Sequence, residues 1–491
     1  MQPISRRRAL QLGGLGLASI GIGAVGLTWR TLSGNTTVAG QALLEPATLT
    51  STDGLLTVRL EAAEGPVRIA GRQATALSYN GGVPGPTLRL RPGDRLRVQL
   101  VNRLAEETNL HVHGLHVSPE RNGDNPFVTV NPGSTFDYDY QLPPDHPSGM
   151  FWYHPHHHGM VADQIFGGLY GAIIVDEPEG ELGSIPITRE RVLVISDISL
   201  NASGSIRPPS AMARLRGREG DLVLVDGQFA PTLEAHPGEL ERWRIVNACT
   251  ARYLRLRLDG QRLRLLGFDS GHLAEPRDVE EILLIPGNRA DVLVATVQGT
   301  STLQALPYPR GEVMGMGGGM GNDPQSRNNA ESTTLATLQV TGDEATPLPP
   351  VTVQTDQLDL RGGPLSARRK LILAMGMGMG GGGMSFTIDG KQFAPDRVDQ
   401  TVQSGTIEEW TITNTSPMDH PIHLHVWPMQ VIEEGGKPIE QPTWQDVVNV
   451  PARSNVKVRI LFDDFAGRSV YHCHILDHED QGMMGVIDVR R

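Results

Sequence analysis

Residues 91–102 read RPGDRLRVQLVN, a glycine turn followed by an alternating segment that ends in asparagine. The same pattern returns at residues 236–247, HPGELERWRIVN, and at residues 403–414, QSGTIEEWTITN. Apolar and polar residues that alternate with a period of two indicate a half-buried β-strand. The three segments therefore predict one strand used three times.

Two further markers surround each copy in the same order. A turn precedes each strand and is followed within a few residues by proline; these turns are Asn80-Gly81, Asp226-Gly227 and Asp389-Gly390. Another turn follows each strand and opens a second one; these are Asn131-Pro132-Gly133, Ile285-Pro286-Gly287 and Val450-Pro451-Ala452. Three ordered markers in three copies predict a threefold internal repeat.

The composition agrees with an all-β chain of repeated sandwiches. The chain has 491 residues, 57 Gly and 35 Pro, and it shows no long helical periodicity. That length suits about three domains, and short strands with frequent turn residues are typical of β-sandwiches. We place the domains at residues 45–180, 188–345 and 350–491.

The N-terminus has the features of an export signal. Arg6, Arg7 and Arg8 precede a Gly/Leu/Ile/Ala run over residues 12–27. This arrangement looks like a twin-arginine signal over residues 1–40, and the run is short for a membrane span of about 20 residues. We expect export to the periplasm or outside the cell, with no stable membrane span in the mature chain. A short uncleaved anchor is the alternative.

Charge and cysteine content limit the partners. The formal net charge is −12, and removal of residues 1–40 would leave 39 basic against 55 acidic side chains. An acidic surface argues against nucleic acid as a partner. Cys249 and Cys473 cannot build a disulfide framework, and Cys249 is best interpreted as a small buried apolar residue.

The run HCHILDHEDQGM, which begins at His472, carries the clearest chemistry. Cys473, His478 and Met483, with a second imidazole, supply the ligand set of a blue-copper electron-transfer site. Neighbouring residues of a strand point to opposite faces, so His472 and His474 are free to bind other metal. The motif predicts an electron-transfer copper connected through Cys473 to a second metal centre.

Histidine pairs recur elsewhere at a spacing of two. Eight histidines fall in the first domain and six in the last, while the middle domain has only two, so we expect the middle domain to be a spacer. The four clusters contain His111 and His113; His154 and His156; His420, His423 and His425; and His472 and His474. So many imidazoles would repel one another if protonated and would be costly to bury without metal.

Zinc is the rival metal. Structural zinc sites use Cys pairs, or Cys with His, in a closed tetrahedron. Eight paired histidines and a separate Cys-His-Met set match no single zinc site. Copper accepts imidazole and thiolate ligands and has redox activity, so copper is the better prediction.

These clusters, in this order near the two ends of a three-domain chain, resemble those of the multicopper oxidases, the laccase and cuprous-oxidase family. The resemblance covers the whole mature chain and implies three cupredoxin-like Greek-key β-sandwich domains with four copper ions: one type 1, one type 2 and two type 3. It implies that the type 1 ligands are His420, Cys473, His478 and Met483, with Met484 as the alternative to Met483. It implies that the type 2 ligands are His111 and His423. It implies that His113, His154 and His474 hold one type 3 copper, and that His156, His425 and His472 hold the other. By the same pattern, the cluster lies between the first and third domains.

The resemblance also implies an activity. Single electrons from a reducing substrate would pass through Cys473 to the cluster, where O2 is reduced to water. The family nominates Glu479 and Asp124 as catalytic acids that relay protons. An ordinary solvated carboxylate is the alternative for each. His116, His146, His157, His158, His236 and His272 are expected to have structural or surface roles.

Two Gly-rich stretches carry methionines that suit soft metal. They contain Met314, Met316 and Met320 in one stretch, and Met375, Met377, Met379 and Met384 in the other. Thioethers on such a chain bind Cu(I) well, and similar segments occur in bacterial cuprous oxidases; incidental methionines in a Gly linker are the alternative. Met418 also matches a substrate-copper position there, although Ser416 replaces the acidic partner and Asp419 is the possible substitute.

Three functions stay open at this point. The first is oxidation of Cu(I) in copper tolerance, and the second is laccase-type oxidation of phenols and aromatic amines. The third is a copper-binding or structural envelope protein without turnover, which would be expected to lack ligands. A monomer with O2 and a small reducing substrate as partners is the expectation.

Overall fold

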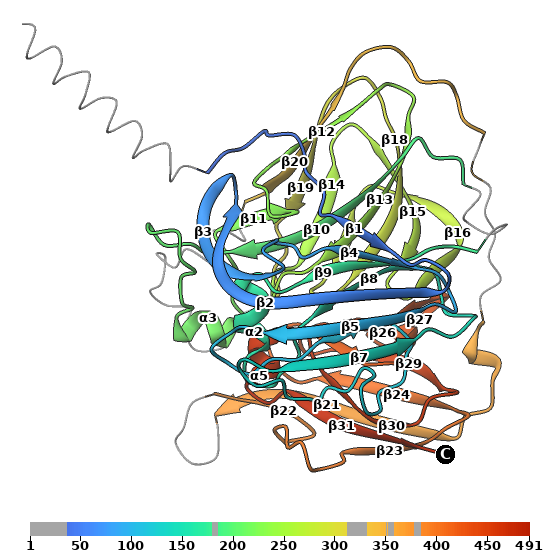
Figure 1. Ribbon diagram of the computed structural model, residues 1–491. Coiled ribbons are helices and arrows are strands. Elements are labelled where there is room, and N and C mark those ends of the chain that lie inside the picture. The colour runs from blue at the N-terminus through green and yellow to red at the C-terminus, as the bar shows by residue number, and fades with distance from the viewer. Residues whose placement is uncertain (1–36, 179–184, 312–330, 350, 352–357, 378–383) are drawn as a thin grey trace, which may run out of the picture.

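The computed structural model describes residues 37–178, 185–311, 331–349, 351, 358–377 and 384–491. Strands dominate it, and six sheets form three two-sheet sandwiches in chain order, which confirms the predicted fold class. In Figure 1 the green-to-yellow second sandwich lies above the blue-to-cyan first one, and the orange-to-red third lies below. Export residues 1–36 lie outside the described part.

The first sandwich joins a four-stranded sheet to a five-stranded sheet around a core that includes Leu60, Leu96 and Tyr138. The four strands, in spatial order, are β3 (Arg72–Tyr79), β2 (Leu55–Ile69), β5 (Arg95–Asn102) and β7 (Thr135–Gln141). The five are β1 (Thr48–Thr50), β4 (Thr87–Leu90), β9 (Gly171–Val175), β8 (Gly149–His154) and β6 (His111–His113).

The second sandwich joins a six-stranded to a five-stranded sheet, and its core contains Cys249 as the sequence predicted. The six strands are β11 (Leu222–Val225), β10 (Arg189–Ile198), β13 (Leu240–Asn247), β18 (Arg289–Ala295), β15 (Arg262–Phe268) and β16 (Gly271–Val279). The five are β12 (Thr232–Ala235), β20 (Thr333–Val340), β19 (Gly299–Leu306), β14 (Leu254–Leu258) and β17 (Ile282–Leu284).

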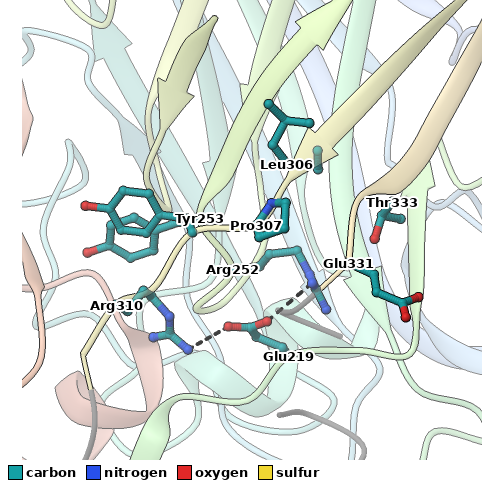
Figure 2. Close-up of a pocket in the computed structure, with 10 residues that line it drawn as sticks. Glu219, Arg252, Tyr253, Leu306, Pro307, Arg310, Glu331 and Thr333 are labelled. Atoms are coloured by element: carbon teal, nitrogen blue, oxygen red, sulfur yellow. Dashed lines mark hydrogen bonds and ion pairs between the residues drawn. The ribbon is translucent and has the colours of Figure 1, made fainter. Parts of the chain in front are cut away.

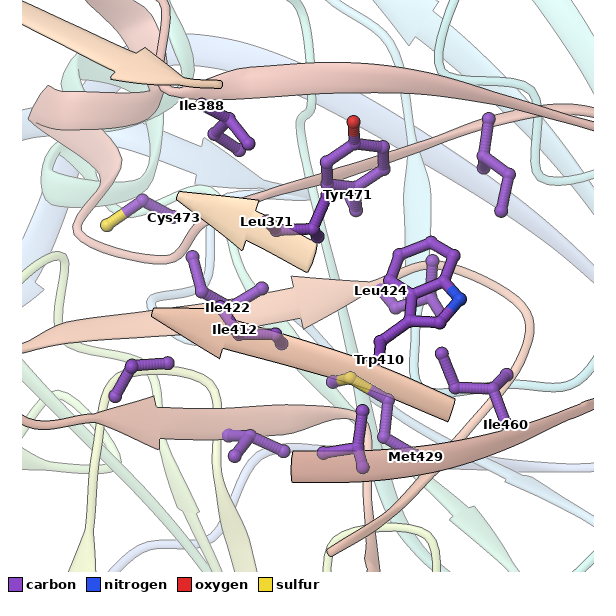
Figure 3. Packing of buried hydrophobic residues seen from close by; sticks show 14 of the residues in the cluster. Leu371, Ile388, Trp410, Ile412, Ile422, Leu424, Met429, Ile460, Tyr471 and Cys473 are labelled. Atoms are coloured by element: carbon purple, nitrogen blue, oxygen red, sulfur yellow. The ribbon is translucent and has the colours of Figure 1, made fainter. Parts of the chain in front are cut away.

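The third sandwich has the same sheet sizes, and Figure 3 shows its core, where Cys473 lies near Ile422. The six strands are β22 (Met384–Ile388), β21 (Ala367–Met377), β24 (Thr406–Asn414), β29 (Asn455–Phe462), β26 (Met429–Glu434) and β27 (Lys437–Gln445). The five are β23 (Gln400–Gln403), β31 (Met484–Arg490), β30 (Gly467–Cys473), β25 (His420–Leu424) and β28 (Val447–Val450).

The asparagine that ends each repeated strand does the same work in every sandwich. The amide nitrogens of Asn102, Asn247 and Asn414 each donate to two backbone carbonyls. Each side-chain oxygen accepts a backbone N–H two residues later. Buried backbone groups at a strand end need such partners, so the repeated asparagine closes the same turn three times.

Short helices lie where the sandwiches meet. They are α2 (Val161–Gly167), α3 (Ala211–Arg216), α5 (Leu476–Asp480) and the 3-10 helix η2 (Leu360–Gly362). α5 packs against both α2 and α3, so the helix that follows Cys473 contacts all three sandwiches. None of the helices in the described ranges is long and apolar enough to cross a membrane.

Candidate metal centre

Strand alternation separates the chemistry around Cys473 into two faces. In the pairing of β25 with β30, Cys473 lies opposite Ile422, and His472 lies opposite His423. Since neighbouring residues point to opposite faces, Cys473 faces the third core while His472 faces the first sandwich. The separation predicted from the HCH run is present.

The first set of metal-binding atoms surrounds the Cys473 sulfur. The Nδ1 atoms of His420 and His478 lie 3.4 and 3.9 Å from Sγ, and all three residues are fully buried. The His420 Nε2 lies 2.8 Å from the Ser416 hydroxyl, and the His478 Nε2 lies 3.1 Å from the Leu215 carbonyl. Donation from Nε2 leaves the Nδ1 lone pairs directed at the sulfur, as a metal site requires.

Burial and packing complete this set. Met483 is buried in the same apolar cluster as Cys473, whereas Met484 does not belong to that cluster. The Phe386 ring stacks on His478 with centroids 4.2 Å apart. Burial raises the pKa of the Cys473 thiol, so a cation is needed to hold it as thiolate.

The eight remaining predicted ligands form one buried cluster between the first and third sandwiches. β6 pairs with β8 so that His111 lies opposite His154, and the third sandwich supplies the facing rings. The Nε2 atoms of His156, His425 and His472 approach one another to between 3.0 and 3.2 Å. The His113 Nδ1 lies 3.4 Å from the His154 Nε2, and the His111 and His423 Nε2 atoms are 3.4 Å apart.

The chemistry of these rings fits metal. Burial lowers the pKa of all eight, to about 4 for His156 and His472, so the rings are neutral and present lone pairs. Among the described residues, neither ring nitrogen of His474 has a hydrogen-bond partner. Buried lone pairs directed at one another repel, and such orphaned nitrogens are costly unless a cation takes them.

Both predicted proton-relay carboxylates lie beside this cluster. The Asp124 carboxylate accepts from the His111 Nδ1 at 2.9 Å and from the Val112 N–H. Glu479 on α5 lies 3.0 Å from the His472 Nδ1, which directs its hydrogen bond instead to the Cys473 carbonyl at 3.1 Å. Burial raises the pKa of Asp124 to about 8 and that of Glu479 to about 7. The alternative of a solvated carboxylate therefore does not hold for either.

The middle sandwich reaches both sets of ligands, which corrects the expectation that it is only a spacer. Leu215 of α3 supplies the carbonyl at His478. Arg289 of β18 makes a paired salt bridge to Asp446, whose carboxylate lies 2.9 Å from the His113 Nε2. Sequence reasoning missed these three residues because none stands in a histidine-spaced motif.

A pocket in the second sandwich adjoins the Cys473 set. Figure 2 shows Arg252 and Arg310 reaching Glu219, at 3.3 and 2.6 Å, with Glu331 on the same wall. Gly311 forms a backbone bridge to Met418, two residues before His420. Residues 312–330 therefore leave the described structure beside the Cys473 set and return to it at the pocket.

The methionines are only partly placed. Met314, Met316, Met320 and Met379 lie outside the described residues. Met375 and Met384 pack partly buried against the core that holds Cys473, and Met377 pairs with Met384 in the β21–β22 hairpin. Met418 is buried.

Other polar residues near the Cys473 set have internal roles. Ser416 bonds to His420 as described above. The Asp419 carboxylate accepts hydrogen bonds from Tyr308, Asn449 and Ala452. These bonds hold Asp419 in the interface between the second and third sandwiches, so it does not stand in for the missing acidic partner.

The remaining histidines have ordinary contacts. His116 forms ion pairs with Asp463 and Asp464, and the His146 Nε2 accepts the His116 backbone N–H. His157 contacts Glu107, His158 packs on Phe393, and His272 contacts Ser148. None of these histidines joins the two ligand sets.

Comparison with known proteins agrees with this geometry. Family models described as "Multicopper oxidase" match residues 61–180, 188–304 and 369–491. The chain is 28% identical over 431 residues to "Multicopper oxidase mco" of Staphylococcus aureus, covering 86% of this chain and 85% of that one. It is 25% identical to a laccase of Bacillus subtilis, covering 84% and 89%. The solved multicopper oxidase of Campylobacter jejuni, described as a metallo-oxidase, superposes with a TM-score of 0.80 at 29% identity, covering 93% and 96%. The three matched segments together span most of the chain, and the chain belongs to the multicopper oxidase family.

Proposed function

We propose that the chain is a four-copper oxidase that couples one-electron oxidation of Cu(I), in copper tolerance, to the reduction of O2 to water. The observation that carries this proposal is the position of Cys473. Its sulfur faces one ligand set while its two chain neighbours face the other. A single residue thus links a site for accepting electrons to a site that can hold several metal ions.

The residues divide as the family resemblance implied. His420, Cys473, His478 and Met483 would hold the type 1 ion. His111 and His423 would hold the type 2 ion. His113, His154 and His474 would hold one type 3 ion, and His156, His425 and His472 the other. When bound, copper supplies the redox chemistry of both sets.

The protein supplies path, orientation and protons. Cys473 and its neighbours give a continuous covalent path between the two sets. Glu479 lies within 3.4 Å of both His156 and His472, and it can carry a proton near neutral pH because burial raises its pKa to about 7. Asp124 fixes His111 by accepting from its Nδ1. Four Cu(I) ions oxidised to Cu(II) balance one O2 and four protons converted to two waters.

Cu(I) is favoured as substrate by the surroundings of the type 1 set. His420 and His478 are fully buried, so a bulky aromatic donor has no exposed imidazole edge to contact. The β21–β22 hairpin carries Met375 and Met384 on the same core as Cys473. The 312–330 segment starts at the Gly311 bridge to Met418. Soft sulfur beside a buried acceptor suits a small soft cation.

Oxidation of phenols is the second candidate, because the chain also resembles a laccase. A copper-binding envelope protein without turnover is the third; every expected ligand is present, which argues against it. We also propose export by the twin-arginine route to the periplasm or outside the cell, on the strength of residues 1–40 alone.

Steady-state O2 uptake by the copper-loaded protein tests the first two candidates directly. Cu(I) and a phenol are supplied separately, and we expect a much larger kcat/KM with Cu(I). A larger value with the phenol would favour a laccase, and no uptake with either would favour the protein without turnover.

Excision of residues 312–330 and 378–383 sharpens the test. Loss of Cu(I) oxidation with phenol oxidation kept or increased supports the methionine segments as the Cu(I) entry. Equal loss of both, or no loss, contradicts that role. Phenol oxidation serves as the internal control for folding and copper content.

A further inference from the structure

We propose that Asp446 is a positioning residue for the histidine cluster, and that Arg289 of the middle sandwich holds it in place. The inference rests on the proposed copper cluster. Its starting point is that Asp446 contacts one ring from each outer sandwich: His113 through its side chain and His423 through its backbone. Both contacts come from a residue with no place in the histidine motifs.

The side chain of Asp446 determines which His113 nitrogen faces the cluster. The His113 Nε2–H donates to Asp446 Oδ1 at 2.9 Å, which leaves the Nδ1 lone pair directed at the His154 Nε2, 3.4 Å away. His111 and His154 are turned the other way, since their Nδ1 atoms bond to Asp124 and to a carbonyl. A hydrogen bond on one ring nitrogen sets which nitrogen can bind metal.

The backbone of Asp446 determines the orientation of a second ring. The His423 Nδ1–H donates to the Asp446 carbonyl at 2.7 Å, so its Nε2 faces His111. The His113 and His423 rings stack with centroids 3.9 Å apart and planes 7° from parallel. One residue therefore holds two stacked rings that belong to different sandwiches.

Arg289 makes this arrangement possible in a dry interior. Its two terminal nitrogens donate to the two Asp446 oxygens at 2.7 and 2.5 Å, and Ser270 donates to Oδ2 at 2.6 Å. A buried carboxylate is tolerated only with such paired, charge-assisted bonds. Arg289 is fixed in turn by the carbonyls of Met150 and Gly287.

The space around this pair is filled. A Cβ added to Gly114 would lie 2.5 Å from an Arg289 nitrogen and 2.8 Å from Asp446 Oδ2. Gly114 also has a φ of +85°, so both backbone and space require glycine at that position. The glycine that follows the His111–His113 pair thus admits a salt bridge from the other two sandwiches.

The test uses the holoprotein with Asp446→Asn, whose amide cannot serve both the Arg289 and the His113 donors. Ser270→Ala is the milder variant, because it removes one bond to Asp446 and keeps the salt bridge. Glu241→Gln is the matched control, since Glu241 forms an equally buried paired bridge with Arg191 at 2.7 Å and touches no ligand. Copper per molecule, copper retention against a chelator, the type 2 and type 3 spectra and the type 1 potential are measured.

We expect cluster copper in Asp446→Asn to be held about 10- to 100-fold more weakly, the usual effect of losing an outer partner of a metal-binding histidine. Ser270→Ala should shift retention in the same direction by a smaller factor. The type 1 potential should not change in either. Cluster retention and spectra in Asp446→Asn equal to those of Glu241→Gln would overturn the inference. Wild-type protein that fails to bind four coppers would instead overturn the proposed function.

Discussion

Gly287 of the middle sandwich sits against the histidine cluster, and replacement by alanine is a sharp probe of it. Its φ is +89°, and an added Cβ would lie 3.0 Å from the His474 Nε2 and 3.1 Å from the His113 Cε1. Carbon contacts are most favourable near 3.5–4.0 Å, so both rings must shift by several tenths of an ångström. Gly287→Ala should displace two rings from the proposed ligand set.

Two effects add in this variant. The left-handed backbone costs an alanine about 1–2 kcal/mol of folding stability. Displacement of the two rings should weaken cluster copper by about 10- to 100-fold, which corresponds to about 1.4–2.7 kcal/mol of binding free energy.

Gly133→Ala separates the two effects. Gly133 occupies the corresponding turn of the first sandwich, with a φ of +75°, and no atom would lie within 4 Å of its Cβ. Its N–H bonds to the carbonyl of Asn102, as the Gly287 N–H bonds to that of Asn247, each at 2.9 Å. The control therefore has the backbone strain without the cluster contact.

The assay compares thermal unfolding, copper content and the cluster spectra of the two variants. Both should unfold at lower temperature than the wild type, and only Gly287→Ala should lose cluster copper. Equal copper content and equal cluster spectra in the two variants would refute the reasoning, because the rings would then tolerate the added carbon.

Other substitutions test separate parts of the site. Glu479→Gln should slow O2 reduction by about 10²- to 10⁴-fold while substrate still reduces the type 1 site at the wild-type rate in rapid mixing; slow reduction at that site would contradict a proton role. Met483→Leu should raise the type 1 potential in a redox titration, from a moderate wild-type value, because a weak axial ligand is lost; a response to Met484→Leu instead would reassign the ligand. Arg218→Leu leaves the buried Asp477 carboxylate, which it bridges at 2.6 Å, without its partner and should destabilise the fold by about 3–5 kcal/mol in chemical unfolding; a loss under 1 kcal/mol would show that water replaces the bridge.

Much of the fold could be predicted because the repeat is written in local sequence. Asn102, Asn247 and Asn414 make the same side-chain bonds to their own turns, so the pattern carries its structure with it. Pairing by alternate residues likewise places Cys473 and His472 on opposite faces of a strand. Domain limits and the Met-rich stretches at 312–330 and 378–383 stay predictions.

The sequence by itself determined the three sandwiches and the twelve residues proposed as copper ligands, because strand period and ligand type are local properties. Only the tertiary structure decided what supports those ligands. Asp446 and Arg289 are 157 residues apart in sequence and meet through a buried salt bridge, and the Leu215 carbonyl reaches His478 across 263 residues. Such partners depend on how three sandwiches pack, and no spacing in the chain encodes that packing.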